Sequence, residues 1–188
     1  MALIHLPTLV TDRLILRPWR DADREPFAEL NADPKVMEFM PRLLSREESN
    51  DFLDRIRAHF AQYGFGLFAA EHRARAAFMG FIGLQTATFE APFTPAVEIG
   101  WRLAPQFWGL GLATEAAREV VRYAFDGAAL QSLVSFTAHT NVRSRRVMEK
   151  LGMTRDPAED FDHPRLPAGH PLRRHVLYRL QRPLEGSG

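Results

Sequence analysis

A glycine-rich turn between an expected strand and an expected helix constrains this chain of 188 residues more than any other feature. Gly109 and Gly111 follow the apolar stretch 97–103, which predicts a strand, and they precede the helix-forming run 113–125. A turn of this kind directs several backbone N–H groups outward, and the helix dipole adds partial positive charge there. The segment therefore predicts a phosphate site, with the pyrophosphate of a nucleotide-containing cofactor as its ligand.

Two common phosphate-binding motifs do not account for this turn. No lysine followed by serine or threonine comes after the glycines, as a P-loop requires. The third glycine of a dinucleotide motif is replaced by Thr114, and the turn lies past the middle of the chain instead of in its first strand–helix unit. A nicotinamide enzyme is therefore disfavoured, while a tight turn without any ligand stays open at this point.

The composition predicts one soluble domain. Hydrophobic residues make up 46% of the chain and charged residues 25%. The 24 lysines and arginines balance 23 acids, so no overall charge favours nucleic acid or a membrane surface. The chain has no cysteine, which excludes disulfides and a cysteine nucleophile. It shows no signal-peptide pattern and no apolar run near the ~20 residues of a membrane span, so we expect a cytoplasmic location.

The remaining pattern predicts a mixed α/β domain over residues 8–181 and a flexible tail over 182–188. Asp21 is expected to cap a helix that runs through Asn31. Ser45 opens a capping box for a second helix, which Gly64 ends. The further expected elements are strands at 8–18, 66–71, 77–88, 97–103, 133–138 and 175–180, a helix over 141–151, and a long loop over 156–171.

Three ordered motifs resemble the Gcn5-related N-acetyltransferase family, and within it the ribosomal-protein N-terminal acetyltransferases. They are TDRLILRP at 11–18, WGLGLATEA at 108–116 and NVRSRRVMEKLGM at 141–153. The family's phosphate pattern, arginine or glutamine followed by x-x-G-x-G/A, falls on 108–113, with Trp108 in the first position. The resemblance implies a single-domain α/β fold, with a mixed, mostly antiparallel sheet of six to seven strands. Helices would flank this sheet, and its fourth and fifth strands would splay apart.

The resemblance also implies acetyl-coenzyme A as the acetyl donor and no metal. Backbone groups along the turn would hold the pyrophosphate, at Trp108, Gly109, Leu110, Gly111, Leu112, Ala113 and Thr114. The pantetheine arm would meet the fourth strand at Trp101, Arg102 and Leu103. Asn141 would bind the arm, cap the following helix, or do both. Arg146, with Arg143 and Arg145 nearby, would meet the adenosine 3′-phosphate or form a solvated helix face.

Candidate catalytic groups follow from the same resemblance. Many relatives protonate the leaving thiolate with a tyrosine, but the matching position here is Met148, so Ser144 is the candidate donor. Ser144 could instead only satisfy the first turn of its helix. Glu98, a carboxylate inside an apolar strand, is the candidate base that deprotonates the amine, because burial raises a carboxylate pKa. An outward-facing Glu98 with no such role stays open, and His139 is the rival base.

The acceptor is expected to be a primary amine, either a protein N-terminus or a small molecule. Its groove would be bordered by the helix 45–63 and the loop 156–171. In this loop the carboxylates of Glu159, Asp160 and Asp162 could attract a cationic amine. Exposed phenylalanines at 89 and 93 suggest a contact surface, and the protein is expected to be a monomer or homodimer.

Other residues whose side chains could take part in catalysis or metal binding have simpler interpretations. Glu115 lies in the first turn of the cofactor helix, where an inward carboxylate would repel phosphate, so we expect it to be structural. The spacing of His163, His170 and His175 matches no zinc motif. The alternative function is an acyl-coenzyme A binding or sensing module without transfer activity, because the tyrosine is missing and the base is uncertain.

Overall fold

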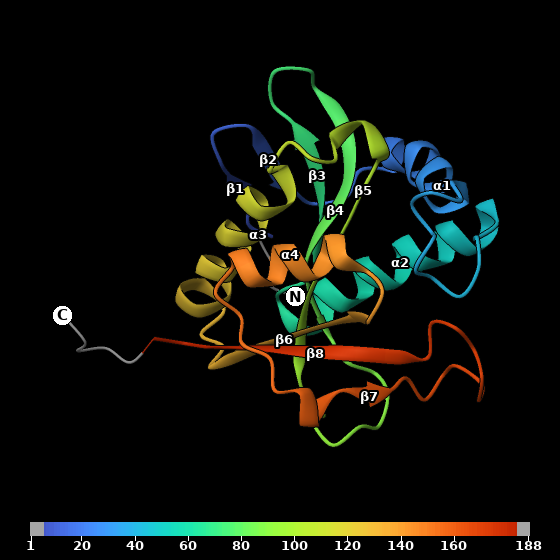
Figure 1. Cartoon of the computed structure of the whole chain (residues 1–188). Helices are drawn as coiled ribbons and strands as arrows, with labels where there is room; N and C mark the ends of the chain where they lie inside the picture. The colour runs from blue at the N-terminus through green and yellow to red at the C-terminus, as the bar shows by residue number, and fades with distance from the viewer. Residues whose placement is uncertain (1–5, 184–188) are drawn as a thin grey trace.

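The computed structural model describes residues 6–183, which form one eight-stranded mixed sheet flanked by helices (Figure 1). The helices are α1 (Arg24–Ala32), α2 (Arg46–Tyr63), α3 (Leu112–Arg122) and α4 (Val142–Lys150). The strands are β1 (Leu9–Val10), β2 (Leu14–Arg17), β3 (Leu67–His72), β4 (Ala77–Thr86), β5 (Val97–Leu103), β6 (Ser132–Ala138), β7 (Phe161–Asp162) and β8 (Arg174–Gln181). Most of the expected tail, residues 184–188, lies outside the described residues.

The sheet has the order β1-β2-β3-β4-β5-β6-β8-β7 and confirms the predicted fold class. Every neighbouring pair is antiparallel except β5 and β6. The count exceeds the predicted six to seven strands because two very short strands join the edges. One of them, β1, arises where the expected strand 8–18 reverses direction, since the Thr11 amide donates to the Leu14 carbonyl. The other, β7, lies within the segment predicted as a loop.

The two parallel strands in the middle of the sheet diverge. Among the described residues, β5 and β6 share a single residue pair, Glu98 with Val134. By contrast, β5 pairs with β4 along its whole length, from Val97 to Leu103. The predicted splay is therefore present, and it opens on the carboxyl side of Glu98.

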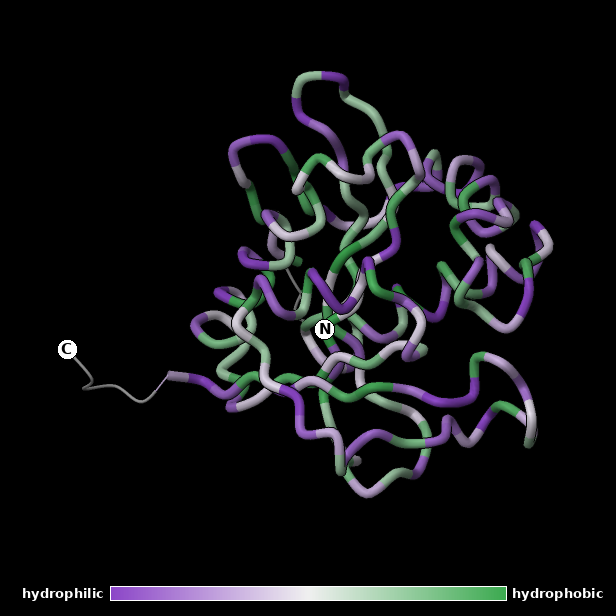
Figure 2. The backbone as a smooth tube through the Cα atoms, viewed as in Figure 1, coloured by the Kyte–Doolittle hydropathy of each residue, from purple (hydrophilic) through white to green (hydrophobic). Residues whose placement is uncertain are grey.

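The hydrophobic core lies between the sheet and the helices. Ala116, Ala117 and Val120 of α3 are fully buried, and their small side chains let this helix lie close on β4 and β5. On α1 and α2, Phe27 and Phe52 both contact Phe81 of β4. Along the helices the tube in Figure 2 alternates between hydrophobic and hydrophilic residues, as expected for helices with one buried face. Within residues 6–183, no helix combines the length and apolar character needed to cross a membrane.

The ends of the helices show which of the expected capping residues form caps. Ser45 and Glu48 form the predicted capping box of α2, and Gly64 ends the helix in the left-handed conformation. The Asn141 side chain caps α4 by accepting from the Ser144 amide at 3.2 Å. Asp21 does not cap α1, because a 3-10 turn over Asp21–Asp23 precedes that helix.

Candidate active site

The glycine turn and the beginning of α3 form one wall of a cavity of about 360 Å³. Its other walls come from the end of β5, the first turns of α4 and the segment 35–40. Of the residues predicted to contact the cofactor, those that line this cavity are Trp101, Arg102, Leu103, Trp108, Gly109, Gly111, Leu112, Ala113, Thr114, Asn141 and Arg146. The structure therefore brings nearly the whole predicted cofactor set together around one space.

The turn has the backbone conformation that an anion cradle needs. Gly109 and Gly111 have φ of 73° and 78°, in the left-handed region that favours glycine. The first helical hydrogen bond of α3 runs from the Glu115 amide to the Gly111 carbonyl, at 3.0 Å. The amides of residues 112–114 precede this bond, so they have no partner within the helix and are available to a ligand.

Arg13 and Glu115 hold the turn in place from behind. The Glu115 carboxylate accepts from the Arg13 amide at 2.9 Å, from the Arg13 side chain at 2.6 Å and from the Thr11 hydroxyl at 2.7 Å. Arg13 also donates to the Leu110 carbonyl at 3.0 Å. Glu115 is therefore structural, as expected. The Leu110 side chain is exposed and does not line the cavity, so the predicted contact of this residue depends on its main chain alone.

The end of β5 presents main-chain groups to the gap between β5 and β6. The Ile99 carbonyl accepts from the Ser135 hydroxyl of β6, and the Leu103 carbonyl accepts from the Trp108 indole, at 2.9 and 2.7 Å. Because peptide groups alternate in direction along a strand, those of Trp101 point the same way. Trp101 lies beyond the last β5–β6 pair, so its N–H and C=O face the cavity and not another strand.

Arg102 departs from the prediction in the atoms it offers. Its main chain pairs with Phe81 of β4, so only its side chain is available at the cavity. The guanidinium donates to the Asn31 side chain at 2.5 Å and to the Met40 sulfur at 3.1 Å. Burial lowers the pKa of Arg102 to about 10, which leaves the side chain a cation at neutral pH.

A basic rim borders the cofactor cavity. Lys35, Arg143, Arg146 and Lys150 all line it. The Arg143 guanidinium stacks over the Trp108 ring at 4.5 Å and pairs with Glu38. Arg145 does not line the cavity, and its side chain donates to the His139 carbonyl. The rim and the backbone donors together fit a ligand with several phosphate groups.

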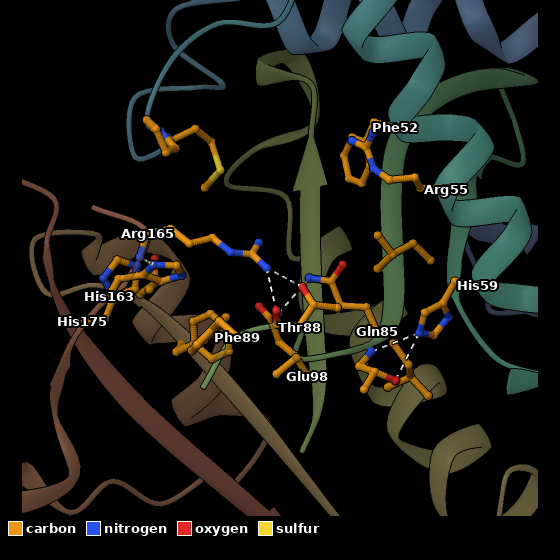
Figure 3. A pocket seen from close by; sticks show the side chains of 18 of the residues that line it. Phe52, Arg55, His59, Gln85, Thr88, Phe89, Glu98, His163, Arg165 and His175 are labelled. Atoms are coloured by element: carbon orange, nitrogen blue, oxygen red, sulfur yellow. Dashed lines mark hydrogen bonds between the residues drawn. The ribbon is translucent and has the colours of Figure 1, made fainter. Parts of the chain in front are cut away.

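A second cavity of about 510 Å³ adjoins the first, and Figure 3 shows it from close by. Phe39 and Met40 line both cavities, so the two spaces share a wall. Phe52, Arg55, Ile56 and His59 of α2 line one side of it. His163, Arg165 and Leu166 line another side, from the loop after β7. These are the two segments expected to border the acceptor groove.

Glu98 lines this second cavity at the point where β5 and β6 separate. Its carboxylate accepts from the Gln85 side chain at 2.8 Å. Burial raises the pKa of Glu98 to about 7, and the Gln85 hydrogen bond opposes that rise. Glu98 can therefore exchange a proton near neutral pH, as a general base requires.

The other titratable groups near the cavity are less suited to that role. The Nε2 atom of His59 accepts a hydrogen bond from the Thr86 amide at 3.1 Å, and Nδ1 lies 2.9 Å from the Phe65 carbonyl oxygen. Both ring nitrogens therefore have hydrogen-bond partners. Burial lowers the pKa of His59, which favours the neutral ring. The rival base His139 is exposed and lines neither cavity.

Ser144 lines the cofactor cavity on the first turn of α4. Its amide is bound by the Asn141 side chain, whose Nδ2 donates to the Thr137 hydroxyl of β6 at 3.0 Å. Thr137 lines the second cavity, so this chain of hydrogen bonds connects the two spaces. Met148 is buried in the core and lines neither cavity.

The acidic loop does not offer free charge to an amine, contrary to expectation. Glu159 pairs with Arg179 at 2.6 Å, Asp160 pairs with Arg155, and Asp162 lies 3.2 Å from Arg173. None of the three acids lines the acceptor cavity. The charges that this loop would have offered are thus already matched within the protein.

The expected exposure of Phe89 and Phe93 is also wrong. Both rings are partly buried and contact each other, with centroids 6.0 Å apart. Phe136 and Phe161 join them, together with His163 and His175. The cluster supports the loop against β6, and burial lowers the pKa of His163 to about 4. Within residues 6–183, no group of three or more potential ligands is placed to hold a metal ion.

Three residues around the acceptor cavity had no signal in the sequence. Gln85 reaches Glu98 through the β4–β5 register, which local patterns do not reveal. Arg55 and Arg165 lie on segments far apart in the chain, and only the fold brings them to one cavity. Finding Gln85 would have required the register between β4 and β5, which places it opposite Glu98.

Comparison with known proteins agrees with this geometry. Residues 13–154 match the family model described as an acetyltransferase (GNAT) domain. The chain is 36% identical over 159 residues to the FsC-acetyl coenzyme A-N(2)-transacetylase of Aspergillus fumigatus, covering 79% of this chain and 65% of that protein.

Solved structures share the fold over almost the whole chain. An acetyltransferase from Agrobacterium tumefaciens superimposes with a TM-score of 0.75 and 28% identity, covering 94% of this chain and 95% of that one. The ribosomal-protein acetyltransferase RimL, solved in complex with coenzyme A, gives a TM-score of 0.73 at 16% identity, with 93% and 98% covered. The chain belongs to the Gcn5-related N-acetyltransferase family, and it is an acyltransferase.

Proposed function

We propose that this protein transfers the acetyl group of acetyl-coenzyme A to a primary amine held in the second cavity. The observation that carries the proposal is the position of Glu98 at the fork of β5 and β6. Glu98 lines the acceptor cavity and can take a proton near neutral pH, and residues 101–103 of the same strand line the cavity that fits the donor. Similarity to an acetyltransferase that acts at a nitrogen supports an amine acceptor.

Different residues of the cofactor cavity would bind different parts of acetyl-coenzyme A. The amides of residues 112–114 and the glycine turn would hold the pyrophosphate, and Arg146 and Lys150 would lie near the remaining phosphate. The Trp101 peptide groups and Asn141 would hold the pantetheine arm. Once bound, acetyl-coenzyme A supplies an activated thioester. A backbone N–H at the end of β5 would then stabilise the negative charge that develops on its carbonyl oxygen.

The chemical roles follow from the two cavities. Glu98 would take a proton from the acceptor's ammonium group, leaving the amine free to form the C–N bond as the C–S bond breaks. The nitrogen would lose its second proton to solvent once the C–N bond has formed. Ser144, on the donor side, would give its proton to the departing thiolate and recover one from solvent. Each group lines the cavity in which its proton is needed.

The test is a thiol-release assay with acetyl-coenzyme A and a panel of amines and N-terminal peptides, paired with titration of the cofactor. We expect saturable cofactor binding and amine-dependent release of free thiol. Binding without thiol release at any amine would contradict the proposal and favour a sensing module. Absence of binding would contradict both functions.

A further inference from the structure

We infer that the amine acceptor also carries an anionic group, and that Arg55 and Arg165 bind this group at the acceptor cavity. The inference rests on the proposed function and specifies its substrate class. On the two segments that border the cavity, the arginines that line it differ from the other arginines in having no carboxylate partner among the described residues.

On α2, the arginines other than Arg55 have carboxylate partners. Arg46 pairs with Glu25, and Arg57 lies 2.9 Å from Asp21. Among the described residues no carboxylate lies within ion-pair distance of Arg55, whose guanidinium is 5.6 Å from the Phe52 ring centroid. Arg55 is also the one of the three that lines the cavity.

The segment between α4 and β8 repeats this contrast. Arg155 and Arg173 pair with Asp160 and Asp162. Arg165 bonds only to neutral oxygens in the described part of the chain, the Thr88 carbonyl at 2.8 Å and the Thr88 hydroxyl at 2.7 Å. Both bonds use Nη2, so the remaining N–H groups of this guanidinium are available to a ligand. Arg165, too, lines the cavity.

The charge around the cavity is therefore positive. Glu98 is the single carboxylate among the described residues that line it, and with a pKa of about 7 it is only partly ionised at neutral pH. The Arg102 cation lies behind Phe52, 5.9 Å from that ring, and has no carboxylate partner within residues 6–183. A purely cationic amine would meet net repulsion here, whereas an anionic group on the acceptor would offset it.

The arrangement also separates the two charges of such a substrate. In Figure 3, Arg55 on α2 and Arg165 on the loop lie on opposite sides of the cavity, and Glu98 lies below both of them in this view. The amine would lie at Glu98, next to the fork. The anionic group would lie toward the guanidinium groups, which bind carboxylate and phosphate oxygens through paired N–H donors.

The experiment compares dipeptide amides that share one N-terminal residue and differ at the second, which is glutamate, phosphoserine, glutamine or lysine. Wild-type kcat/KM should be about tenfold or more higher for the two anionic peptides than for the glutamine peptide, and lowest for the lysine peptide. The ratio between the glutamate and phosphoserine peptides identifies the preferred anion. The anionic preference should shrink as ionic strength rises, because both guanidinium groups are exposed to solvent.

Variants assign the preference to the two arginines. R55Q and R165Q should each reduce the anionic preference, and the double variant should abolish it. The preference should be lost because kcat/KM falls for the two anionic peptides, whereas kcat/KM for the glutamine peptide should not fall. R75Q, an exposed arginine on the β3–β4 turn outside both cavities, should leave the preference unchanged.

A wild-type enzyme that prefers the glutamine or lysine peptide would overturn the inference, as would a double variant that keeps the wild-type preference. In either case turnover of the amines would leave the proposed function intact. Failure to acetylate any amine would instead contradict the proposed function, and this inference with it.

Discussion

Glu98 faces Val134 across the one residue pair that joins β5 to β6 in the described chain. β5 stays paired with β4 along its whole length, whereas beyond Glu98 it has no further pair with β6, and Trp101, Arg102 and Leu103 there line the cofactor cavity. Glu98 therefore lies at the fork of the two strands, where it lines the acceptor cavity.

The Gln85 side chain tunes the Glu98 carboxylate. Its 2.8 Å hydrogen bond favours the ionised form, so removing it in Q85L should raise the pKa of Glu98 above its value of about 7. We expect the acidic limb of the kcat/KM profile to move to higher pH by about 0.5 to 1 unit. A limb at the wild-type position would show that another group controls it.

Ser144 should affect the chemical step and not cofactor binding. In S144A we expect the single-turnover rate to fall by about tenfold or more, while the Kd for acetyl-coenzyme A stays unchanged. S144T keeps the hydroxyl and should retain most of the rate. Equal rates for S144A and wild type, with chemistry rate-limiting, would limit Ser144 to a structural role in α4.

Gly111 should be required for cofactor binding because of its backbone conformation. Its φ of 78° makes an added Cβ unfavourable by about 1–2 kcal/mol, so G111A should shift the turn and weaken acetyl-coenzyme A binding by about tenfold. Gly169 is a matched control, since its φ is 82° and it lies outside both cavities. G169A should cost similar stability in denaturant unfolding and leave the Kd unchanged. Equal effects of the two variants on the Kd would contradict a specific role of the turn.

The elements around the turn could be predicted from sequence because their signals are local. The capping box at Ser45, the left-handed Gly64 and the strand before Gly109 each depend on residues close in the chain. The reversal at Thr11 could not be predicted, because its alternating apolar residues fit one longer strand equally well.

The acceptor side was harder to predict because its residues act through distant partners. Glu159 looks like free charge in the sequence, but Arg179 of β8 neutralises it once the loop folds back. Phe89 lies beside a proline-rich segment and looks exposed, yet Phe136 of β6 covers it. Charge and exposure at a loop depend on tertiary contacts, so local patterns identified the donor site more completely than the acceptor site.

Buried ion pairs connect β2 to the turn before α1 and to β3. Arg17 pairs with Asp23 at 2.7 Å and with Glu71 at 2.8 Å, and its side chain is only 7% exposed. R17M would leave the buried Asp23 carboxylate without its ion-pair partner and Glu71 with Arg20 alone, so the free energy of unfolding should fall by about 3–5 kcal/mol. R24M breaks the exposed pair with Asp54 and should cost under about 1 kcal/mol. Similar losses in urea unfolding for both variants would contradict this difference.

The pH dependence of E98Q shows whether Glu98 is the base in the transfer. Deprotonated Glu98 is the active form, so wild-type kcat/KM should rise with pH through a pKa of about 7, as measured by thiol release under low acceptor concentration. The kcat/KM of E98Q should be lower by about 10²–10⁴-fold and should not show this rise with pH, while its Kd for acetyl-coenzyme A matches that of wild type. An E98Q enzyme with wild-type activity and an unshifted limb would contradict the claim that Glu98 deprotonates the acceptor.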